Sequence, residues 1–599
     1  MLDLTQPPAA LTGRQRAIYW AVALVSAATR FLAMARSIWD WDEALFCLGM
    51  RSFDVTSHHP HPPGFPVYIG AAKLLRLFTD SDFRALQAVN LIAGVLLFPA
   101  MFILARELRL RFETGLIAAA LCAFFPNVWF FGGSAFSDVP SIVLVVFAIA
   151  MLFRGVRDGK AYQIGTLTLA LAIGIRPQNL LVGLFPGLLA TWYRFKASRR
   201  SVVLAALMGI AVCAIAYGAA IYATGTFSGY MTTVRAHGEY ITKIDSFRSP
   251  GRPPLWRIFD RFFIKQYQSP ALSIIASIFV VISTIGATRS RDRRIGYIAL
   301  AFAPFAISAW LMLDRFSINR FSIGYCPLFA VLIVDGIERL SFRRPVVEGV
   351  IGSALVASFF LWTLPALTSV RNQIAPSVAA VQSIRRHLDP KRDQLFVAFA
   401  MTPFVQYFEP TYPFLRAMDD CALPLSSGSR RPWLLMELDT TPDRGFVFTR
   451  DHGHLWDISR RHYFDVALAP VRELPQFVSG WYAAERSDTD EWRWMGAHSV
   501  TRLPPATGET VLRLAFDVPD EIMPEHPRVT IAVNGTSVAR FRPTEPHLAR
   551  EYRVTPAANG VPNVLELSVD RVLNPAQRHL GDDSRDLGLL VRMLSWGPG

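Results

Sequence analysis

The sequence predicts a helical membrane protein with about eleven transmembrane helices, followed by a C-terminal α/β unit and a β-sandwich outside the membrane. Of its 599 residues 52% are hydrophobic, and the long apolar runs end near residue 370. The formal net charge is +14, and much of it lies in short loops between apolar runs. A nucleic-acid duplex could not reach such loops, so we expect membrane lipids, and anionic lipid in particular, as the partner of these charges rather than nucleic acid.

Residues 1–15 are expected to form a short, flexible cytoplasmic lead, and 16–370 a transmembrane domain. The first apolar run is too long for a removed signal peptide and lacks a small-residue cleavage site. The predicted spans are 16–34, 85–106, 112–131, 138–153, 161–175, 178–194, 201–223, 269–288, 294–313, 321–339 and 347–367.

Alternate connections between these spans are rich in arginine and lysine, which predicts that they are cytoplasmic. These basic clusters lie in 106–111, 154–160, 194–200, 289–294 and 339–344. Only Arg176-Pro177-Gln178 separates the fifth span from the sixth, and merging the two would invert everything downstream. Because the basic loops would then face outward, the charge pattern favours two spans. The remaining loops and everything after 367 are then extracytoplasmic.

The tail changes pattern twice. From 371 to 478, a helix-like stretch at 378–388 alternates with short apolar strands, which predicts a small α/β unit. From 479 to 599, period-2 strands and the Asn534-Gly535 turn predict a β-sandwich of jelly-roll type. Its aromatic residues could stack on sugar rings or fill the core, and both alternatives stay open; they are Trp481, Tyr482, Trp492 and Trp494.

The first external loop carries acidic residues at the end of a membrane span, in Trp39-Asp40-Trp41-Asp42-Glu43. An ionisable residue in such a place is a candidate functional group. On a helix, Asp42 and Glu43 point about 100° apart, so they cannot act together on one atom. We expect one carboxylate to act as a general base and its neighbour to orient a substrate or a backbone amide. The alternative is that all three acids are solvated or cap the next helix.

A histidine- and proline-rich turn follows, with His58, His59 and His61. Its prolines predict a rigid turn that leads into a short interfacial helix over 67–78. The histidine spacing is not one that zinc sites use, so we expect no metal, and His59 and His61 are candidates for hydrogen bonds to a phosphate or a sugar.

Further candidates lie at other external mouths. Asp138 opens the fourth span, where it could be a functional carboxylate or an N-cap. The 224–268 loop mixes cations with aromatics, which suits a lipid-linked phosphate or a generic anionic-lipid contact; its candidates are Arg235, His237, Lys243 and Arg248. Arg320 opens a late span, where its guanidinium could hold a phosphate leaving group or simply lie at the interface.

These stretches resemble the GT-C superfamily of integral-membrane glycosyltransferases, particularly its protein O-mannosyltransferase and aminoarabinose-transferase branch. The resemblance covers about 16–370. It is carried by Trp41-Asp42-Glu43-Ala44, His61-Pro62-Pro63-Gly64-Phe65-Pro66, Ser137-Asp138-Val139-Pro140, Gly174-Ile175-Arg176-Pro177-Gln178, and Arg320-Phe321 with Pro327.

The resemblance implies transfer of one sugar from a polyprenyl-phosphate donor to an extracytoplasmic acceptor, with inversion and without a metal or cofactor. Asp42 would be the base, although Asp40 is a second candidate. Glu43 and Asp138 would position the acceptor or the base, and Arg320 with the basic residues of the 224–268 loop would hold the donor phosphate. The acceptor could be a glycan, a lipid or a protein. The absence of an evident retention signal and the all-β tail favour a bacterial inner membrane.

Two other classes of protein fit part of the pattern. A transporter or flippase for lipid-linked sugars would also have many spans and basic patches, but it should carry ionisable groups near the bilayer midplane in both halves. A non-catalytic, glycan-binding protein of envelope assembly would not depend on Asp42 or Arg320.

Overall fold

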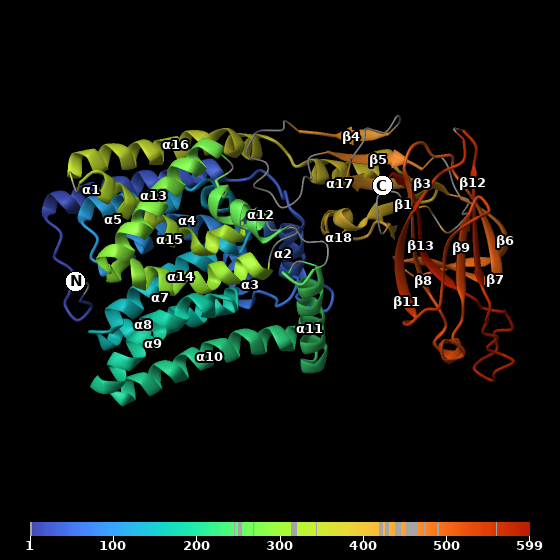
Figure 1. Cartoon of the computed structure of the whole chain (residues 1–599), viewed down its shortest axis with the longest axis horizontal. Helices are drawn as coiled ribbons and strands as arrows, with labels where there is room; N and C mark the ends of the chain where they lie inside the picture. The colour runs from blue at the N-terminus through green and yellow to red at the C-terminus, as the bar shows by residue number, and fades with distance from the viewer. Residues whose placement is uncertain are drawn as a thin grey trace. The chain divides into compact units, whose positions relative to one another are not determined.

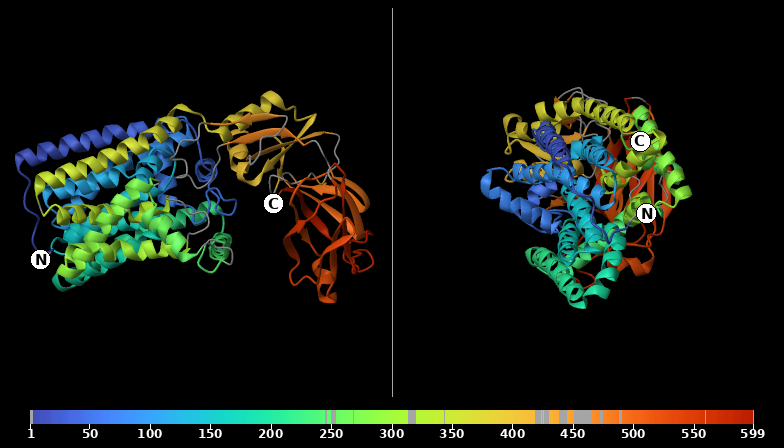
Figure 2. Two further views of the ribbon diagram at one scale, coloured as in Figure 1. Left: turned by 45° about the horizontal axis from the view of Figure 1, so that its top comes forward. Right: turned by 90° about the vertical axis from the view of Figure 1, so that its left-hand side faces the viewer.

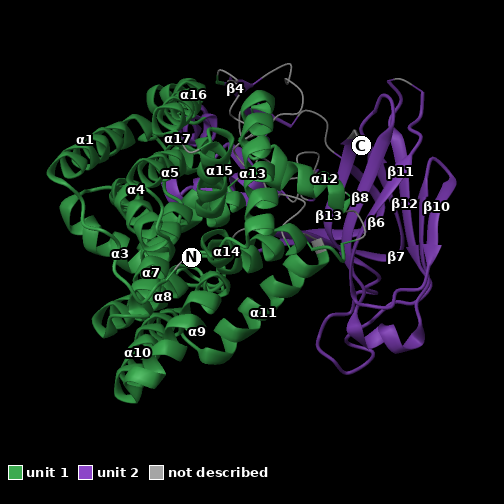
Figure 3. Ribbon diagram, turned by 60° about the vertical axis from the view of Figure 1, so that its left-hand side comes forward, with its two compact units in different colours: residues 1–375, 450–462 green, residues 376–449, 463–599 purple. Residues whose placement is uncertain are grey.

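The computed structural model describes residues 3–244, 246–249, 254–267, 269–312, 320–342, 344–417, 423, 425, 430–437, 445–450, 465–471, 475–487, 490–558 and 560–598. The chain divides into two compact units (Figure 3). Unit 1 comprises Met1–Ala375 and Arg450–His462, and unit 2 comprises Pro376–Thr449 and Tyr463–Gly599.

Unit 1 is a bundle of helices, which the end-on view shows running alongside one another (Figures 1 and 2). Each of the eleven predicted spans holds helix in the described chain. The corresponding helices are α1 (Gly13–Arg30), α4 (Asp82–Glu107), α5 (Phe112–Phe124) with α6 (Pro126–Phe131), α7 (Asp138–Gly155), α8 (Gly159–Ile175), α9 (Asn179–Ala197), α10 (Arg199–Thr224), α13 (Pro270–Ser290), α14 (Arg293–Met312), α15 (Cys326–Leu340) after the 3₁₀ turn η4 (Phe321–Tyr325), and α16 (Pro345–Asn372).

Seven of the described helical stretches are long and apolar enough to cross a membrane by themselves. They begin at Asp82, Asp138, Arg199, Pro270, Arg293, Phe321 and Pro345. On α10, large apolar side chains such as Ile210 and Ile215 are exposed, whereas Gly209 faces Ala170 of α8. Small residues thus lie where α10 contacts α8, and large apolar residues lie on the surface that can face lipid. Proteins embedded in a bilayer have this arrangement.

Shorter elements lie between these helices, and several of them border the candidate site. They are α2 (Trp41–Arg51), α3 (Pro66–Leu75) with η2 (Arg76–Phe78), α11 (Phe227–Ile244), α12 (Leu255–Phe259) and the π turn η3 (Asp260–Ile264). The short helix expected over 67–78 is therefore present as α3 and η2.

The turn between α8 and α9 makes two helices of the fifth and sixth spans, as predicted. Asn179 stabilises this turn because its side-chain amide donates to the Ala172 carbonyl at 2.6 Å and to Ser141 Oγ at 2.8 Å. The Ala172 carbonyl also accepts from the backbone amide of Arg176, the C-cap of α8, so Asn179 adds a second hydrogen bond at the end of this helix.

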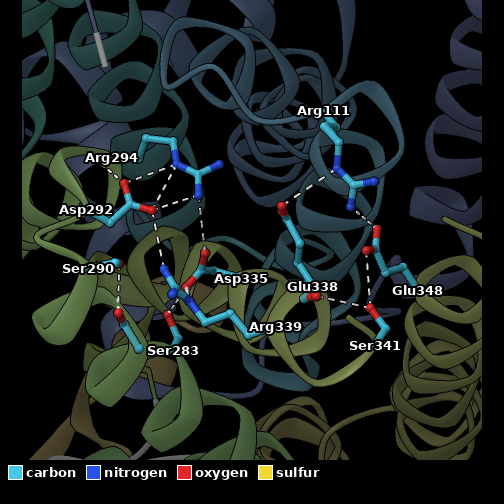
Figure 4. Close-up of polar contacts among 11 residues, drawn as sticks. Arg111, Ser283, Ser290, Asp292, Arg294, Asp335, Glu338, Arg339, Ser341 and Glu348 are labelled. Atoms are coloured by element: carbon cyan, nitrogen blue, oxygen red, sulfur yellow. Dashed lines mark hydrogen bonds and ion pairs between the residues drawn. The ribbon is translucent and has the colours of Figure 1, made fainter. Parts of the chain in front are cut away.

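The basic connections meet one another at the end of unit 1 remote from α2. Arg157 pairs with Glu107 across α7 and α4, at 2.6 Å. Figure 4 shows a second set of contacts, in which Arg339 on α15 pairs with Asp292 and Arg111 pairs with Glu348 on α16. Acidic side chains, of which Glu107 and Glu348 are buried, thus neutralise part of the positive charge that the sequence places in these turns.

The N-terminal lead contacts the basic turns through its main chain, and its flexibility stays a prediction. Leu4 is buried, and the backbone carbonyls beside it accept hydrogen bonds from arginines of the basic turns. Arg157 donates to the Leu4 carbonyl at 3.1 Å, and Arg109 donates to the Gln6 carbonyl. The lead is therefore docked by its main chain, which no side-chain pattern could indicate.

Unit 2 begins with the predicted α/β element. Its mixed sheet has the order β2-β1-β3-β5-β4, and the first three strands are parallel. In chain order the elements are α17 (Pro376–His387), β1 (Asp393–Ala398), the 3₁₀ turn η5 (Phe399–Met401), α18 (Thr402–Phe408), β2 (Phe414–Ala417), β3 (Arg431–Glu437), β4 (Phe446–Phe448) and β5 (Val466–Pro470).

The remainder of unit 2 is all β, and it starts at Gln476. Its strands are β6 (Gln476–Arg486), β7 (Glu491–Leu503), β8 (Thr510–Asp517), β9 (Val529–Val533), β10 (Thr536–Phe541), β11 (His547–Val554), β12 (Asn563–Val569) and β13 (Leu590–Pro598), with the 3₁₀ turn η7 (Asp520–Glu525) after β8. The order is β10-β9-β12-β7-β13-β8-β11, with β6 also paired to β7.

Strand β7 joins the two halves of this sheet, because its C-terminal part pairs with β12 and its N-terminal part with β13. Inward residues of both halves, such as Leu514 on β8 and Leu567 on β12, share one buried cluster. The sheet thus encloses a core as a sandwich does, but it is continuous through β7, and the jelly-roll topology stays a prediction. The tight turn falls at Asn534 and Gly535, both with positive φ.

The four aromatic residues named for this part are all half-buried. Trp481 donates to Thr501, and Trp492 donates to Glu485. Trp481, Tyr482 and Trp494 pack against the shared core. A sugar-stacking role for these residues remains a prediction.

Candidate functional site

The acidic loop forms the first turn of α2, and its carboxylates have different surroundings. Asp40 is the N-cap, and its Oδ1 accepts from the Asp42 amide at 2.8 Å. Glu43 reaches back to accept from the amides of Asp40 at 2.9 Å and Trp39 at 2.7 Å. These bonds make a capping box, which fixes where α2 begins and how its first turn is oriented.

Glu43 also ties α2 to the turn that precedes α7. Its Oε1 accepts from the Ala135 amide at 2.8 Å and from the Ser134 hydroxyl. Complete burial raises the pKa of Glu43 to about 7, although the hydrogen bonds to its carboxylate act in the opposite direction. The oxygens of Glu43 thus accept hydrogen bonds from three backbone amides, and its part in catalysis stays a prediction.

Asp42 occupies the position between these two capping residues and points elsewhere. Its Oδ2 accepts a hydrogen bond from Arg320 Nη2 at 2.6 Å. Arg320 precedes η4, so the contact joins segments 278 residues apart. As whole residues, both are more than nine-tenths buried. The structure therefore brings together two of the residues singled out in the sequence, whose chemical roles stay predictions.

Asp138 and Arg176 extend this pair into a row of alternating charges. Asp138, at the start of α7, accepts from Arg176 Nη2 at 2.8 Å, and its Oδ2 lies 3.7 Å from Arg320 Nε. Arg176 comes from the α8–α9 turn and also donates to Ser137 Oγ at 3.0 Å. The row Asp42–Arg320–Asp138–Arg176 is nine-tenths buried throughout and carries two charges of each sign.

Arg320 keeps unused hydrogen-bonding capacity within this row. In the described part of the chain, its Nε and Nη1 are buried and have no hydrogen-bond partner. The faces of its guanidinium lie against the rings of Phe136 at 4.8 Å and Phe321 at 5.1 Å. Burial lowers the pKa of Arg320, but the carboxylates of Asp42 and Asp138 raise it by more, so the side chain stays cationic.

The histidine–proline turn places one of its histidines against Asp42. His61 Nδ1 lies 3.9 Å from Asp42 Oδ1, and its ring packs between those of Phe46 and Phe65. Burial lowers the pKa of His61 to about 3, so this imidazole is neutral in the folded protein at ordinary pH. His59 is held by its main chain, which exchanges two hydrogen bonds with Asp54.

Of the predicted phosphate-binding residues near α11, one comes close to the row of charges. The His237 ring lies 6.3 Å from that of His61, and Tyr230 Oη donates to the Pro63 carbonyl at 2.8 Å, which fixes α11 to the histidine–proline turn. The other three cations are exposed, and within the described chain no ion pair joins them to the row; they are Arg235, Lys243 and Arg248.

Sequence reasoning missed two cations at this site. It treated Arg176 only as part of a turn, although a charged residue at the end of a span was itself a signal. Arg450 also belongs to unit 1, and its guanidinium lies 5.2 Å from the centroid of the Trp39 ring. No local pattern marks Arg450, because its place depends on how a distant segment folds. No cluster of three or more His, Cys, Asp or Glu able to hold a metal occurs among the described residues.

No protein family and no curated protein matches this sequence. Among solved structures, the chain is similar to the crystal structure of ArnT from Cupriavidus metallidurans bound to undecaprenyl phosphate. The two share 12% identity, with 77% of this chain and 98% of that chain covered and a TM-score of 0.48. For ArnT in the apo state the identity is 13%, the coverage 76% and 97%, and the TM-score 0.47. The likeness concerns the course of the chain over most of both proteins.

Proposed function

We propose that this protein is an integral-membrane glycosyltransferase that moves a sugar from a polyprenyl-phosphate donor to an acceptor hydroxyl. The observation that carries the proposal is the buried contact between Asp42 and Arg320, in which the guanidinium has N–H groups to spare. A carboxylate beside a cation with free donors is the minimum that such a transfer requires: a base and a group that binds the phosphate.

Arg320 is suited to the phosphate of the donor. A guanidinium presents parallel N–H donors that match two phosphate oxygens, and it does so best where water is excluded. Negative charge grows on the phosphate as the sugar leaves it, so a fixed cation stabilises the transition state more than the ground state. A phosphate leaving group needs little help from an acid, and no nucleotide-binding fold is required.

Asp42 is the base in this proposal. The acceptor oxygen attacks the anomeric carbon from the face opposite the phosphate, while its proton passes to Asp42. The bond between the anomeric carbon and the phosphate oxygen breaks, and the electron pair leaves with the polyprenyl phosphate. The products are the glycosylated acceptor with inverted configuration, polyprenyl phosphate, and a protonated Asp42 that later releases its proton to water. A positioned base of this kind contributes about 10²–10⁴ in rate.

The surrounding groups have supporting roles. Asp138 and Glu43 hold the geometry, the first by fixing arginines and the second by fixing α2. His61 is neutral, so it contributes hydrogen bonds to sugar hydroxyls rather than charge. Exposed cations near α11 meet the lipid phosphate as it approaches, and the exposed apolar helix surfaces lie along the polyprenyl chain.

A transporter for lipid-linked sugars fits the described structure less well. In this protein, the buried charges lie at helix ends, such as Glu107 at the end of α4 and Asp138 at the start of α7. The paired midplane sites expected of a transporter are not among the described residues of these helices.

The experiment that tests the proposal uses purified protein in lipid nanodiscs with a panel of radiolabelled polyprenyl-phosphate sugars. We expect the wild type to release sugar from one donor, and Asp42→Asn to bind that donor but fail to turn it over. If binding occurs without turnover in the wild type, and Asp42→Asn changes nothing, the transferase proposal is wrong and transport or glycan binding takes its place.

A further inference from the structure

Arg320 has two carboxylate neighbours, and its contacts with them are unequal. It donates to Asp42 at 2.6 Å, whereas its Nε lies 3.7 Å from Asp138. Arg176 makes the close contact with Asp138, at 2.8 Å. Asp138 therefore has a cation of its own and does not depend on Arg320.

The separate pairing of Asp138 with Arg176 matters because leaving a buried carboxylate without a partner costs much free energy. If Arg176 were absent, Arg320 would be the one cation in the row to neutralise two carboxylates, Asp42 and Asp138. Arg320 would then be drawn from its present contact towards Asp138, and its spare donors would be used. With Arg176 in place, Arg320 can turn from Asp42 to a phosphate without leaving Asp138 uncompensated.

Binding of the donor phosphate would also change the surroundings of Asp42. In the structure, Arg320 donates to Asp42 Oδ2, and the row Asp42–Arg320–Asp138–Arg176 sums to zero charge. A donor phosphodiester adds one negative charge and competes for the guanidinium. Once Arg320 turns to the phosphate, Asp42 loses its hydrogen bond from Arg320 and gains an anionic neighbour, and both changes raise its affinity for a proton. The carboxylate thus becomes an effective base when the donor has bound.

We propose that Arg176 is a positioning residue: by neutralising Asp138 it leaves Arg320 free to exchange Asp42 for the donor phosphate, and this exchange releases Asp42 as the base. The inference rests on the proposed function and adds an order to it, donor before acceptor. Arg176 does not touch the reacting atoms; it acts through Asp138 and Arg320.

The experiment measures binding of undecaprenyl phosphate, without a sugar, to the full-length protein in nanodiscs. The variants are Arg176→Gln, Arg176→Lys and the double variant Arg176→Gln/Asp138→Asn. Arg154→Gln is the matched control, because Arg154 also pairs with a buried carboxylate, Glu107, but at the opposite end of unit 1. Thermal unfolding of every variant shows whether a change in binding reflects a loss of fold.

We expect Arg176→Gln to weaken binding about tenfold or more, and Arg176→Lys to weaken it less, because the charge is kept without the fork of donors. The double variant should bind within about threefold of the wild type, since no carboxylate is left to draw Arg320 away. Arg154→Gln should leave the Kd unchanged. In turnover assays, Arg176→Gln should raise the donor KM more than it lowers kcat.

Two results would overturn the inference. One is a folded Arg176→Gln protein with the Kd and donor KM of the wild type. The other is a double variant that binds as weakly as Arg176→Gln, which would mean that Arg176 itself, rather than the release of Arg320, serves the donor. If Arg176→Gln does not fold, the double variant decides, because it leaves no unpaired carboxylate. Failure of the wild type to bind or use any donor contradicts the proposed function instead, so the two failures are distinguishable.

Discussion

Asp40 and Asp42 are the same residue type two positions apart, but their side chains make different contacts. Asp40 caps α2 through the amide of Asp42, whereas Asp42 faces Arg320. From the sequence, either could have been the base. The cap geometry explains the difference, because an N-cap side chain turns back towards the helix while the side chain at the second helical position projects away from it.

The matched variants Asp42→Asn and Asp40→Asn test this assignment. Asp42→Asn removes the base and should lower kcat by about 10²–10⁴. Asp40→Asn keeps a good N-cap, so we expect it to cost less than about 1 kcal/mol of stability and to change kcat far less. Steady-state turnover with the preferred donor measures both. Equal losses in the two variants, or a larger loss for Asp40→Asn, would show that the base has been misassigned.

His61 makes a prediction about pH. Its pKa in the folded protein is about 3, below its value of 6.5 in an unfolded chain. Between these values the unfolded chain binds more protons than the folded one, so stability is present above pH 6.5 and is lost as the pH falls towards 3. We expect the difference in Tm between pH 7.5 and pH 5 to be smaller in His61→Gln than in the wild type. The exposed His547, replaced in the same way, is the control. An unchanged pH dependence in His61→Gln contradicts the prediction.

At the scale of elements, α15 carries the site at one end and a polar network at the other. Its first turn follows η4 and Arg320, and its last turns present Asp335, Glu338 and Arg339 (Figure 4). Asp335 is buried and accepts from Ser283 Oγ at 2.6 Å and from Arg339 Nε at 2.7 Å. These contacts fix α15 against α13 and thereby the helix that positions Arg320.

Replacing Asp335 tests this anchoring. Asp335→Ala leaves the buried Ser283 hydroxyl of α13 and the half-buried Arg339 of α15 without their shared acceptor, so we expect it to lower the free energy of unfolding by about 3 kcal/mol. Glu551→Ala, which breaks an exposed pair with Arg513 in unit 2, should cost less than about 1 kcal/mol. Thermal or denaturant unfolding in the same detergent compares the two. A loss for Asp335→Ala no larger than that for Glu551→Ala would show that the network does not anchor the helix.

The elements of the whole molecule were more predictable than its long-range contacts. Spans such as 201–223 could be located because lipid-facing helices are apolar along their own length, so the signal is local. The hydrogen bonds that Glu43 accepts from Ser134 and Ala135 join residues some ninety positions apart, and neither stretch of sequence indicates that it contacts the other. Backbone carbonyls, such as that of Leu4, accept hydrogen bonds whatever their side chain is, so the sequence does not indicate which of them do so.

In the candidate site too, single residues were predictable from the sequence but their contacts were not. Asp42, Asp138 and Arg320 could be singled out because a charge at the mouth of an apolar span is conspicuous. Their contact could not be foreseen from composition, and neither could the pairing of Arg176 with Asp138, since both depend on how helices pack. Exposed cations near α11, such as Lys243, were as conspicuous in the sequence, yet they lie outside the buried row.

The orientation of the whole molecule in its membrane gives the last prediction. The row of charges and the basic turns lie at opposite ends of the spanning helices, and α10 alone, with 26 residues, is about 39 Å long, more than the hydrocarbon thickness of a bilayer. The two ends should therefore face opposite compartments. The positive-inside rule predicts that the start of α10, at Arg200, is cytoplasmic and that the loop at Ser57 is extracytoplasmic.

Single cysteines at these two exposed positions test the orientation, in a background from which the five native cysteines have been removed. In intact spheroplasts, a membrane-impermeant maleimide should label Ser57→Cys, and it should label Arg200→Cys only after the membrane is permeabilised. The reverse pattern would place the site on the cytoplasmic face, where an extracytoplasmic acceptor could not reach Asp42. Labelling of both positions in intact cells would mean that the two ends share one compartment, and the assignment of unit 1 as membrane-spanning would fail.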